Sequence, residues 1–378
     1  MKIAMIGIYG GVNRDFNPGN VLIAFYTKRE IEKRIKNIDI TIFSLDYSLQ
    51  KGMQKENCFP NTPFEMEINF FAYEQIEKIC KILNEQYSAI ILGGDIVIGF
   101  SDAFFLKNII NCSNHPKIIM NTVSTLWRPH LISNIQKKNI KTLAEESDYI
   151  AVREEYVEEL FRVCGVTKDM YVVPDPVLLH EKSEWRMTDN VADYVKKYKK
   201  NKKKILGISD CFLRERDVIE ALIKSSIIKD YTVVFFSYSK RYEHSEKAYN
   251  YNKILGKYCE YIFEYLNPWE TFSLIENLDL CVGNAYHCCI AAITANTPFI
   301  GIDPSPFQRS RHTDILRKRR TISQFILKSE VVNNDKSGQT LQKYLENHMK
   351  NDYDYAFDLS EERLRIQKHF DLICEMLY

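Results

Sequence analysis

The sequence predicts an α/β protein built from two Rossmann-like domains that face a central cleft. The chain has 378 residues, and a domain usually holds about 100–200, so two hydrophobic cores are expected. Short apolar runs alternate with helical patterns, as in a doubly wound parallel sheet, and this alternation restarts after the lysine-rich stretch Tyr194–Lys204. We expect an N-terminal domain at 1–185, a C-terminal domain at 186–335 and a helical tail at 336–378 that packs back on the body.

The N-terminal half contains apolar runs of strand length separated by helical patterns. The segment from Asp46 to about Asn69 has mixed polarity and contains Pro60 and Pro63, so we expect a long loop there, placed to lie over the cleft. The expected strands are Lys2–Ile8, Ile38–Ser44, Ala89–Leu92, Lys117–Asn121, Tyr149–Val152 and Tyr171–Val173. The expected helices are Val21–Ile35, Phe70–Asn84 and Asn134–Glu146.

The C-terminal half repeats this architecture without repeating the sequence. We interpret Tyr194–Lys204 as a solvated helix end and interdomain linker. The expected strands are Ile205–Ser209, Thr232–Ser237, Tyr261–Glu264, Leu280–Val282 and Phe299–Ile302, and the expected helices are Val218–Ser225, Glu243–Lys257, Pro268–Glu276 and Cys288–Ala295. In the amphipathic tail the expected core contacts are Leu341, Tyr344, Leu345, Leu364, Ile366, Phe370 and Ile373.

Composition excludes several classes of function. The 51 basic residues balance 50 acidic ones, so no overall field favours nucleic acid, and none is expected as a partner. No apolar run approaches the roughly 18–20 residues that span a bilayer, so membrane contact is expected to be peripheral at most. The ten cysteines contain no Cys-x-x-Cys pair, which favours free thiols and a cytoplasmic location.

Candidate binding residues lie in turns that follow strands, because ligands of open parallel sheets sit outside the carboxyl ends of the strands. One turn contains Gly10 and Gly11 and leads to a helix start that can present amides to an anion. A plain loop with an asparagine cap explains that turn equally well. The candidate substrate-binding residues from this turn and the next are Gly10, Gly11, Asn17, Gly19, Asn20, Gly93, Gly94 and Asp95.

Two later turns add further candidates. Asp175 stands between two prolines and either caps the following segment or faces the cleft. Asn284 and His287 lie where a strand gives way to a helix, so His287 is either a proton-transfer residue or a buried core histidine. Adjacent helical residues such as His287 and Cys288 point about 100° apart and do not share a metal easily, so no metal site is expected.

Five motifs in order resemble the polysaccharide pyruvyltransferase family over about residues 3–303. They are Asn17–Ile23, Leu92–Asp95, Ala151–Tyr156, Pro174–Val177 and Gly283–His287. The resemblance implies a fold similar to the B-type glycosyltransferases and a phosphoenolpyruvate donor. It also implies a glycan or lipid-linked sugar acceptor and a cyclic pyruvate ketal as product. Such enzymes act on the cytoplasmic side while a cell-surface polysaccharide is built.

The chain departs from the family pattern at two positions. Asn20 stands where the family typically has aspartate, and Ala285 stands where it typically has arginine. Arginine is the natural bidentate partner of carboxylate and phosphate. Arg153, Arg309 and Arg311 are therefore candidates to bind the donor in its place, although Arg309 and Arg311 also fit a basic surface loop.

These observations leave three functions open. The first is pyruvyl transfer with His287 as general acid or base and no cofactor. The second is a glycosyltransferase that uses a nucleotide sugar in the same architecture, since a fold does not fix a reaction. The third is a non-catalytic member that binds a glycan. A homo-oligomer is compatible with the sequence, which does not identify the acceptor.

Overall fold

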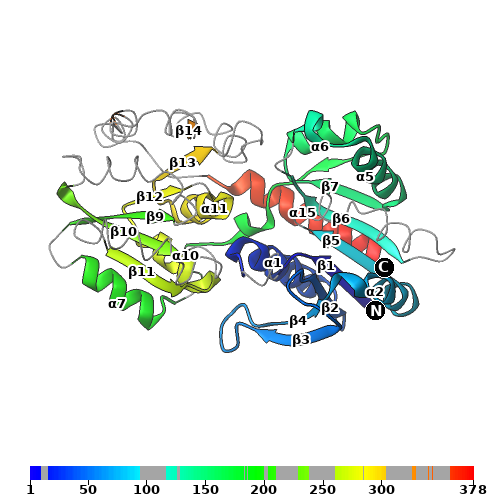
Figure 1. Ribbon diagram of the computed structural model, residues 1–378, viewed down its shortest axis with the longest axis horizontal. Coiled ribbons are helices and arrows are strands. Elements are labelled where there is room, and N and C mark those ends of the chain that lie inside the picture. Colours follow the sequence, from blue (N-terminus) through cyan, green and yellow to red (C-terminus); the bar gives the residue numbers. More distant parts are fainter. Residues whose placement is uncertain are drawn as a thin grey trace. The chain divides into compact units, whose positions relative to one another are not determined.

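The computed structural model describes residues 1–9, 16–93, 116–125, 128–182, 184, 186–199, 203–209, 229–237, 260–283, 285–303, 326–328, 339, 343 and 358–378. The chain divides into two compact units. The first holds Met1–Leu179 and Leu359–Tyr378, and the second holds His180–Asp358. Each unit has its own β-sheet (Figure 1). The first unit is therefore made of two chain segments, and the second unit lies between them in the sequence.

Among the described residues, the sheet of the first unit has eight strands in the order β3-β4-β2-β1-β5-β6-β7-β8. The strands are β1 (Lys2–Gly7), β2 (Asp39–Leu45), β3 (Met53–Cys58), β4 (Met66–Phe71), β5 (Ala89–Gly93), β6 (Lys117–Val123), β7 (Tyr149–Val152) and β8 (Tyr171–Val172). All pairs are parallel except β3 with β4. The central strands are continuous apolar runs, as is usual where both faces of a parallel sheet are covered.

The helices of the first unit connect these strands. They are α1 (Pro18–Arg34), η1 (Tyr73–Gln75), α2 (Ile76–Gln86), η2 (Pro129–Leu131), α5 (Asn134–Glu146), α6 (Glu155–Val163), η3 (Pro176–Leu179) and α15 (Ser360–Leu377). The helix expected at Asn134–Glu146 has the same bounds as α5. Ser133 and Gln136 form a capping box that fixes its start.

The long loop expected between Asp46 and Asn69 is wrong, because β3 and β4 pair there as an antiparallel hairpin. β3 is an edge strand of mostly exposed polar residues, so it lacks the alternation that signals a half-buried strand. Pro60 and Pro63 lie in the turn between the two strands. The helix expected from Phe70 begins only at Ile76, because Phe70 and Phe71 belong to the buried end of β4.

The described part of the second unit holds a parallel sheet of six strands in the order β11-β10-β9-β12-β13-β14. The strands are β9 (Lys204–Ser209), β10 (Tyr231–Ser237), β11 (Glu260–Tyr265), β12 (Leu280–Gly283), β13 (Phe299–Asp303) and β14 (Ile326–Lys328). The described helices are α7 (Asp189–Tyr198), α10 (Pro268–Glu276) and α11 (Tyr286–Ala295). The two Rossmann-like sheets confirm the predicted α/β fold class.

One expectation for the second half is wrong, and two others concern residues that the structure does not describe. The stretch Tyr194–Lys204 is not an interdomain linker, because it starts inside α7 and lies within the second unit. The helices expected at Val218–Ser225 and Glu243–Lys257 lie outside the described residues. No described helix is long and apolar enough to cross a membrane.

Each sheet has a topological switch point beside its first strand. In the first unit the chain runs from β1 to β2 on one side and later returns to β5 on the other side of β1. In the second unit β9 likewise lies between β10 and β12. Ligands of open α/β sheets bind outside the carboxyl ends of the strands at such points. Ligands are therefore expected at the carboxyl ends of β1 and β5 in the first sheet and of β9 and β12 in the second.

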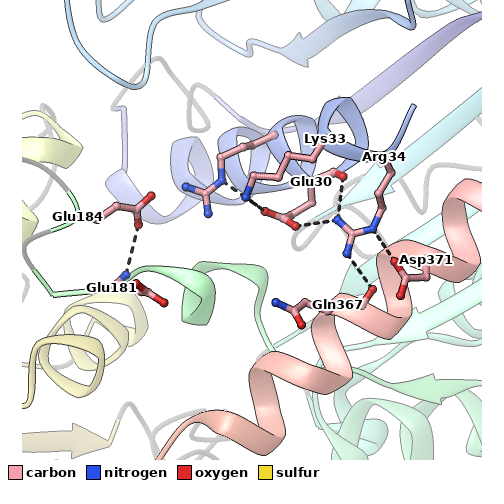
Figure 2. A network of polar contacts seen from close by, with 8 residues as sticks. Glu30, Lys33, Arg34, Glu181, Glu184, Gln367 and Asp371 are labelled. Carbon is pink, nitrogen blue, oxygen red and sulfur yellow. Dashed lines mark hydrogen bonds and ion pairs between the residues drawn. The ribbon is translucent and has the colours of Figure 1, made fainter. Parts of the chain in front are cut away.

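The C-terminal helix α15 belongs to the first unit and packs against α1 and η3 (Figure 1). Figure 2 shows the polar contacts that attach it. Arg34 on α1 donates from Nε to Asp371 Oδ1 at 2.7 Å and from Nη2 to the carbonyl of Gln367 at 3.2 Å. Glu30 on α1 accepts from Arg34 Nη1 at 2.8 Å and so orients the guanidinium.

The apolar face of α15 agrees with the expected core contacts except at one position. Ile366, Phe370 and Ile373 are buried, which confirms them, whereas Leu364 is 49% exposed. The expectation for Leu364 was wrong because a residue two positions before Ile366 lies about 200° around the helix from it. Leu341, Tyr344 and Leu345 lie outside the described residues.

A buried chain of hydrogen bonds joins α15 to the sheet. His369 Nε2 lies 2.7 Å from Asn121 Oδ1, and His369 Nδ1 lies 2.8 Å from the Tyr149 hydroxyl. Asn121 Nδ2 donates to Thr27 Oγ1 at 2.9 Å, so its oxygen accepts from His369 Nε2–H and Tyr149 donates to Nδ1. Burial lowers the pKa of His369 to about 3, and the ring is neutral.

Candidate functional site

The switch point of the second sheet is formed by the ends of β9 and β12, which pair in parallel. β9 ends at Ser209 and β12 ends at Gly283. A Cβ atom on Gly283 would lie 3.2 Å from Ser209 Cβ, so glycine allows the two strand ends to approach closely. Ser209 Oγ is buried and has no hydrogen-bond partner among the described residues. An unsatisfied buried hydroxyl costs about 1–3 kcal/mol, and a polar ligand group at this edge would remove that cost.

Helix α11 starts at the same edge, directly after β12. Ala285 is its N-cap residue and offers no side-chain hydrogen bond to the helix amides. A helix N-terminus carries partial positive charge and favours an anion. His287 lies in the first turn of α11, is 7% exposed and packs edge-to-face against Tyr286 with ring centroids 5.0 Å apart. This edge therefore combines an anion-favouring helix start, a buried hydroxyl and an imidazole.

The two cysteines that follow His287 are part of the core. Cys288 and Cys289 are buried on α11, and burial raises the pKa of Cys289 well above its usual value. A neutral buried thiol is a poor nucleophile. Within the described ranges, no group of three or more His, Cys, Asp or Glu residues has the arrangement of a metal site. Asn284, Arg309 and Arg311 lie outside those ranges.

The first sheet carries a buried charged cluster at the carboxyl ends of β6, β7 and β8. Arg153 follows β7, is 4% exposed and places Nη1 3.1 Å from Asp175 Oδ2. Glu154 Oε1 lies 4.0 Å from Arg153 Nε, and Glu154 Oε2 accepts from Ser124 Oγ at 2.7 Å. Asp175 Oδ1 accepts from the amide of Val177 at 2.9 Å. The structure thus brings Arg153 and Asp175 together as an ion pair that ties the start of η3 to β7.

Tyr9 occupies the switch point of the first sheet. A Cβ atom on Gly7 would lie 2.8 Å from the Tyr9 ring, and a Cβ on Gly93 would lie 2.9 Å from the Tyr9 hydroxyl. Both glycines are therefore required for the ring to fit. Tyr9 is 2% exposed, and burial raises the pKa of its hydroxyl. The candidates Gly10, Gly11, Gly94 and Asp95 lie outside the described residues.

The asparagine-rich turn before α1 is described from residue 16. Asn17 Oδ1 accepts from the amide of Gly19 at 3.0 Å, and its carbonyl accepts from the amide of Asn20 at 3.1 Å. Pro18 occupies the first helical position, where its missing N–H costs nothing. Asn17 thus acts as a helix cap, and Gly19 and Asn20 form the first turn of α1 beside it.

Four residues that lie at these edges were not among the predicted site residues: Tyr9, Thr122, Glu154 and Ser209. Each stands at or just after the end of a strand, and Ser209 is the last residue of a strand that the sequence predicts. Their position at the end of a strand could therefore have indicated them as candidate site residues. Their burial and hydrogen bonds were not accessible, because those depend on strands far apart in the chain.

Comparisons with known proteins give the family through a family model and the fold through solved structures. A model of the polysaccharide pyruvyl transferase family matches residues 17–306. No curated protein is significantly similar in sequence. Among solved structures, the chain is similar to the UDP-GlcNAc 2-epimerase of Methanocaldococcus jannaschii in complex with UDP-GlcNAc and UDP. The TM-score is 0.60 and the identity 14%, over 98% of this chain and 100% of that one.

Two further structures give the same result. The UDP-GlcNAc 2-epimerase of Neisseria meningitidis bound to UDP-GlcNAc has a TM-score of 0.59 at 11% identity, covering 100% of this chain and 99% of its own. An E. coli protein described as trehalose-6-phosphate bound with UDP-2-fluoro glucose has a TM-score of 0.55 at 11% identity, covering 100% and 96%. These likenesses show a fold of the B-type glycosyltransferase kind. Because the family model spans most of the chain, the protein belongs to the polysaccharide pyruvyl transferase family and is a transferase.

Proposed function

We propose that the protein transfers pyruvate from phosphoenolpyruvate to a sugar of a cell-surface polysaccharide precursor and forms a cyclic ketal. The observation that carries this proposal is the edge of the second sheet, where Ser209, the start of α11 and His287 occur together. Membership of the family supplies the class of reaction. The work would take place on the cytoplasmic side of the membrane, with contact to the membrane at most peripheral.

Phosphoenolpyruvate matches the chemistry of this edge. It carries a phosphate and a carboxylate, and the start of α11 favours one such anion. A hydrogen bond from Ser209 Oγ to a phosphate or carboxylate oxygen would be stronger than a bond to a neutral acceptor. Imidazole exchanges protons near neutral pH, so His287 is suited to proton transfer beside the bound anion.

The reaction balances without a cofactor. One acceptor hydroxyl oxygen bonds to C2 of phosphoenolpyruvate while C3 gains a proton and becomes a methyl group. The second hydroxyl oxygen then bonds to C2 as the bond from C2 to the phosphate oxygen breaks, and inorganic phosphate leaves. The two acceptor hydroxyls lose two protons in all. One of them restores the general acid that protonated C3, and the other leaves with the phosphate. We assign His287 to one of these transfers as general acid or base.

A second candidate function is supported by Ala285. The family resemblance places an arginine there, and the alanine cannot clamp a carboxylate. A nucleotide-sugar donor needs no carboxylate clamp, and its phosphates would suit the same helix start. The solved structures named above bind UDP compounds, and their likeness bears on the fold alone. Arg309 and Arg311 remain the cationic candidates to bind phosphoenolpyruvate, whereas Arg153 is paired with Asp175 in the first unit.

A donor screen separates these functions. Phosphoenolpyruvate, UDP-sugars and nucleoside diphosphates are added singly, and the melting temperature is measured, because a ligand that binds only the native state stabilises it by mass action. The stabilising donor is then incubated with methyl glycosides, and inorganic phosphate and acceptor mass are followed. We expect phosphate release and an acceptor heavier by one pyruvate less one water. Transfer of a hexose from a UDP-sugar would establish the second function. Binding of a methyl glycoside without turnover of any donor would support a non-catalytic member that binds a glycan.

A further inference from the structure

We infer that the switch point of the first sheet binds a neutral sugar through the hydroxyls of Tyr9 and Thr122. Both hydroxyl oxygens are buried and lack a hydrogen-bond partner among the described residues. Buried polar groups in native proteins are rarely left without a partner, so each such group calls for an explanation. The inference rests on the proposed function in that it takes the sugar to be the acceptor.

The position of Tyr9 is fixed by the backbone around it. The ring lies against Gly7 at the end of β1, and the hydroxyl lies over Gly93 at the end of β5. Any larger residue at either glycine would clash with the ring or its hydroxyl. A phenylalanine would fill the same space without leaving a buried hydroxyl unsatisfied. The tyrosine hydroxyl is therefore not explained by packing.

Thr122 adds a second observation on the next strand. It lies at an irregularity of β6 between Met120 and Val123, and its φ of 48° is left-handed. For a β-branched residue this conformation is a genuine outlier and is energetically costly. The residue is fully buried, and its hydroxyl has no partner among the described residues. Such strain is found most often at binding sites.

The two hydroxyls lie at neighbouring strand ends. Gly93 on β5 pairs with Asn121 on β6, and Thr122 directly follows Asn121. A Cβ atom on Gly93 would lie 2.9 Å from the Tyr9 hydroxyl and 3.8 Å from the Asn121 carbonyl oxygen. Tyr9 and Thr122 therefore flank the same point of the sheet edge, which is the place where open α/β sheets bind ligands.

The charges at this edge favour a neutral ligand. The buried ionic side chains described just after other strands of this sheet are Asp46 after β2, Arg153 and Glu154 after β7, and Asp175 after β8. Arg153 lies against the carboxylates of Glu154 and Asp175. The carboxylates outnumber the cation, so an anion would be repelled. A hydroxyl both donates and accepts a hydrogen bond, which matches the hydroxyls of a sugar. A neutral sugar therefore fits this edge, and an anionic donor fits the edge of the second sheet.

The test measures glycoside binding without any donor. Saturation-transfer NMR titrations with the methyl glycosides of galactose, glucose, mannose and N-acetylglucosamine give dissociation constants for the full chain. Tyr9→Phe keeps the ring over the glycines, and Thr122→Val keeps the branched shape, so each removes only a hydroxyl. We expect at least one glycoside to bind the wild type and to bind each variant about tenfold more weakly. Tyr9→Phe should also leave the melting temperature without ligand unchanged or raise it, because it removes an unsatisfied buried group.

The matched controls are Tyr47→Phe, which changes an exposed tyrosine, and Thr142→Val, whose hydroxyl bonds to Lys138 on the exposed face of α5. Both should keep the wild-type glycoside affinity. Unchanged affinity in Tyr9→Phe and Thr122→Val, or no glycoside binding by the wild type, would overturn the inference. Glycoside binding that depends on the two hydroxyls in a protein that does not consume phosphoenolpyruvate would support the inference and contradict the proposed function instead.

Discussion

The two switch points have the same topology and different contents. At the first, the ring of Tyr9 fills the space over Gly7 and Gly93. At the second, the small side chain of Ser209 lies beside Gly283, and a helix start with His287 follows. Each edge holds a buried hydroxyl without a partner among the described residues. The difference therefore lies in size and charge, not in the arrangement of strands.

This difference underlies our proposal that one architecture, used twice, serves two ligands. At the first edge, Arg153 is paired with Asp175, and Glu154 accepts a hydrogen bond from Ser124. The second edge presents a helix N-terminus, which favours an anion. The comparison predicts different results for equivalent mutations in the two units, and four experiments test it.

The largest effect is expected at the second edge for His287→Gln. Glutamine keeps the size and one hydrogen bond but cannot transfer a proton, and a general acid or base contributes about 10²–10⁴ in rate. Turnover should fall by at least about 10², while the melting temperature barely moves. The control is His130→Gln, which changes an exposed histidine of the first unit. Full activity in His287→Gln would remove the histidine from the mechanism, and a variant that fails to fold would make it a core residue.

The next largest effect is expected at the first edge for Asp175→Asn. The substitution leaves Arg153 buried without its carboxylate partner, which destabilises by about 3–5 kcal/mol in buried pairs. Glu154 remains 4.0 Å from Arg153, so we expect the lower end, about 3 kcal/mol, from urea unfolding. Glu67→Gln breaks the exposed pair with Lys55 and should change stability by less than about 1 kcal/mol. Equal effects of the two substitutions would contradict a structural role for Asp175.

A smaller effect should distinguish the buried histidines of the two units by pH. The pKa of His369 falls from 6.5 to about 3 on burial, so the unfolded chain binds a proton that the folded first unit does not. Its contribution to stability is complete above pH 6.5 and falls by up to about 2 kcal/mol by pH 5. Urea unfolding of wild type and His369→Gln from pH 8 to 5 should show the steeper loss in the wild type.

His180 in the second unit should show the opposite sign. Burial acts to lower its pKa, but hydrogen bonds to Glu184 and Glu276 outweigh burial and raise it. The folded state then binds the proton more tightly, so this contribution is present below pH 6.5 and is lost as the pH rises through the raised pKa. A His180→Gln variant should therefore lose more stability at low pH than at high pH. The same sign of pH dependence for both histidines would refute the comparison.

The smallest effect is expected for Ser209→Ala. Removal of an unsatisfied buried hydroxyl should leave stability unchanged or raise it, while donor affinity should fall about tenfold through loss of one hydrogen bond to an anion. Ser147→Ala is the matched control, because Ser147 Oγ is also buried but donates to the carbonyl of Leu143 at 2.7 Å. That control should cost about 1 kcal/mol without affecting donor affinity. Calorimetric titration with the donor and thermal melts provide both readings.

The fold was largely predictable because its central strands are apolar runs and its helices have strong local signals. The capping box at Ser133 and the strand Tyr149–Val152 are examples. The hairpin of β3 and β4 was missed because β3 lies at the edge of the sheet and carries mostly polar residues, which alternate only weakly in hydropathy. An edge strand is stabilised by pairing with its neighbour, and a linear pattern does not report that pairing.

The positions of the candidate residues relative to the strands were predictable, and their contacts were not. The rule that ligands bind at strand ends located His287 and Asp175 correctly relative to the sheets. It did not indicate that Asp175 pairs with Arg153 or that Tyr9 covers Gly93, because these contacts join residues from strands distant in sequence. Local sequence thus predicts where a side chain starts, while long-range packing decides what it meets.

The return of α15 to the first unit has a consequence for the order of folding. During synthesis, the strands of the first unit leave the ribosome early, but helix α15, whose His369 bonds to Asn121 on β6, follows the whole second unit in the chain. The second unit is one continuous segment and can complete its core first, whereas the first unit must hold an uncovered face until residues 359–378 emerge. Nascent chains that stall before α15 would expose apolar surface and become substrates for chaperones.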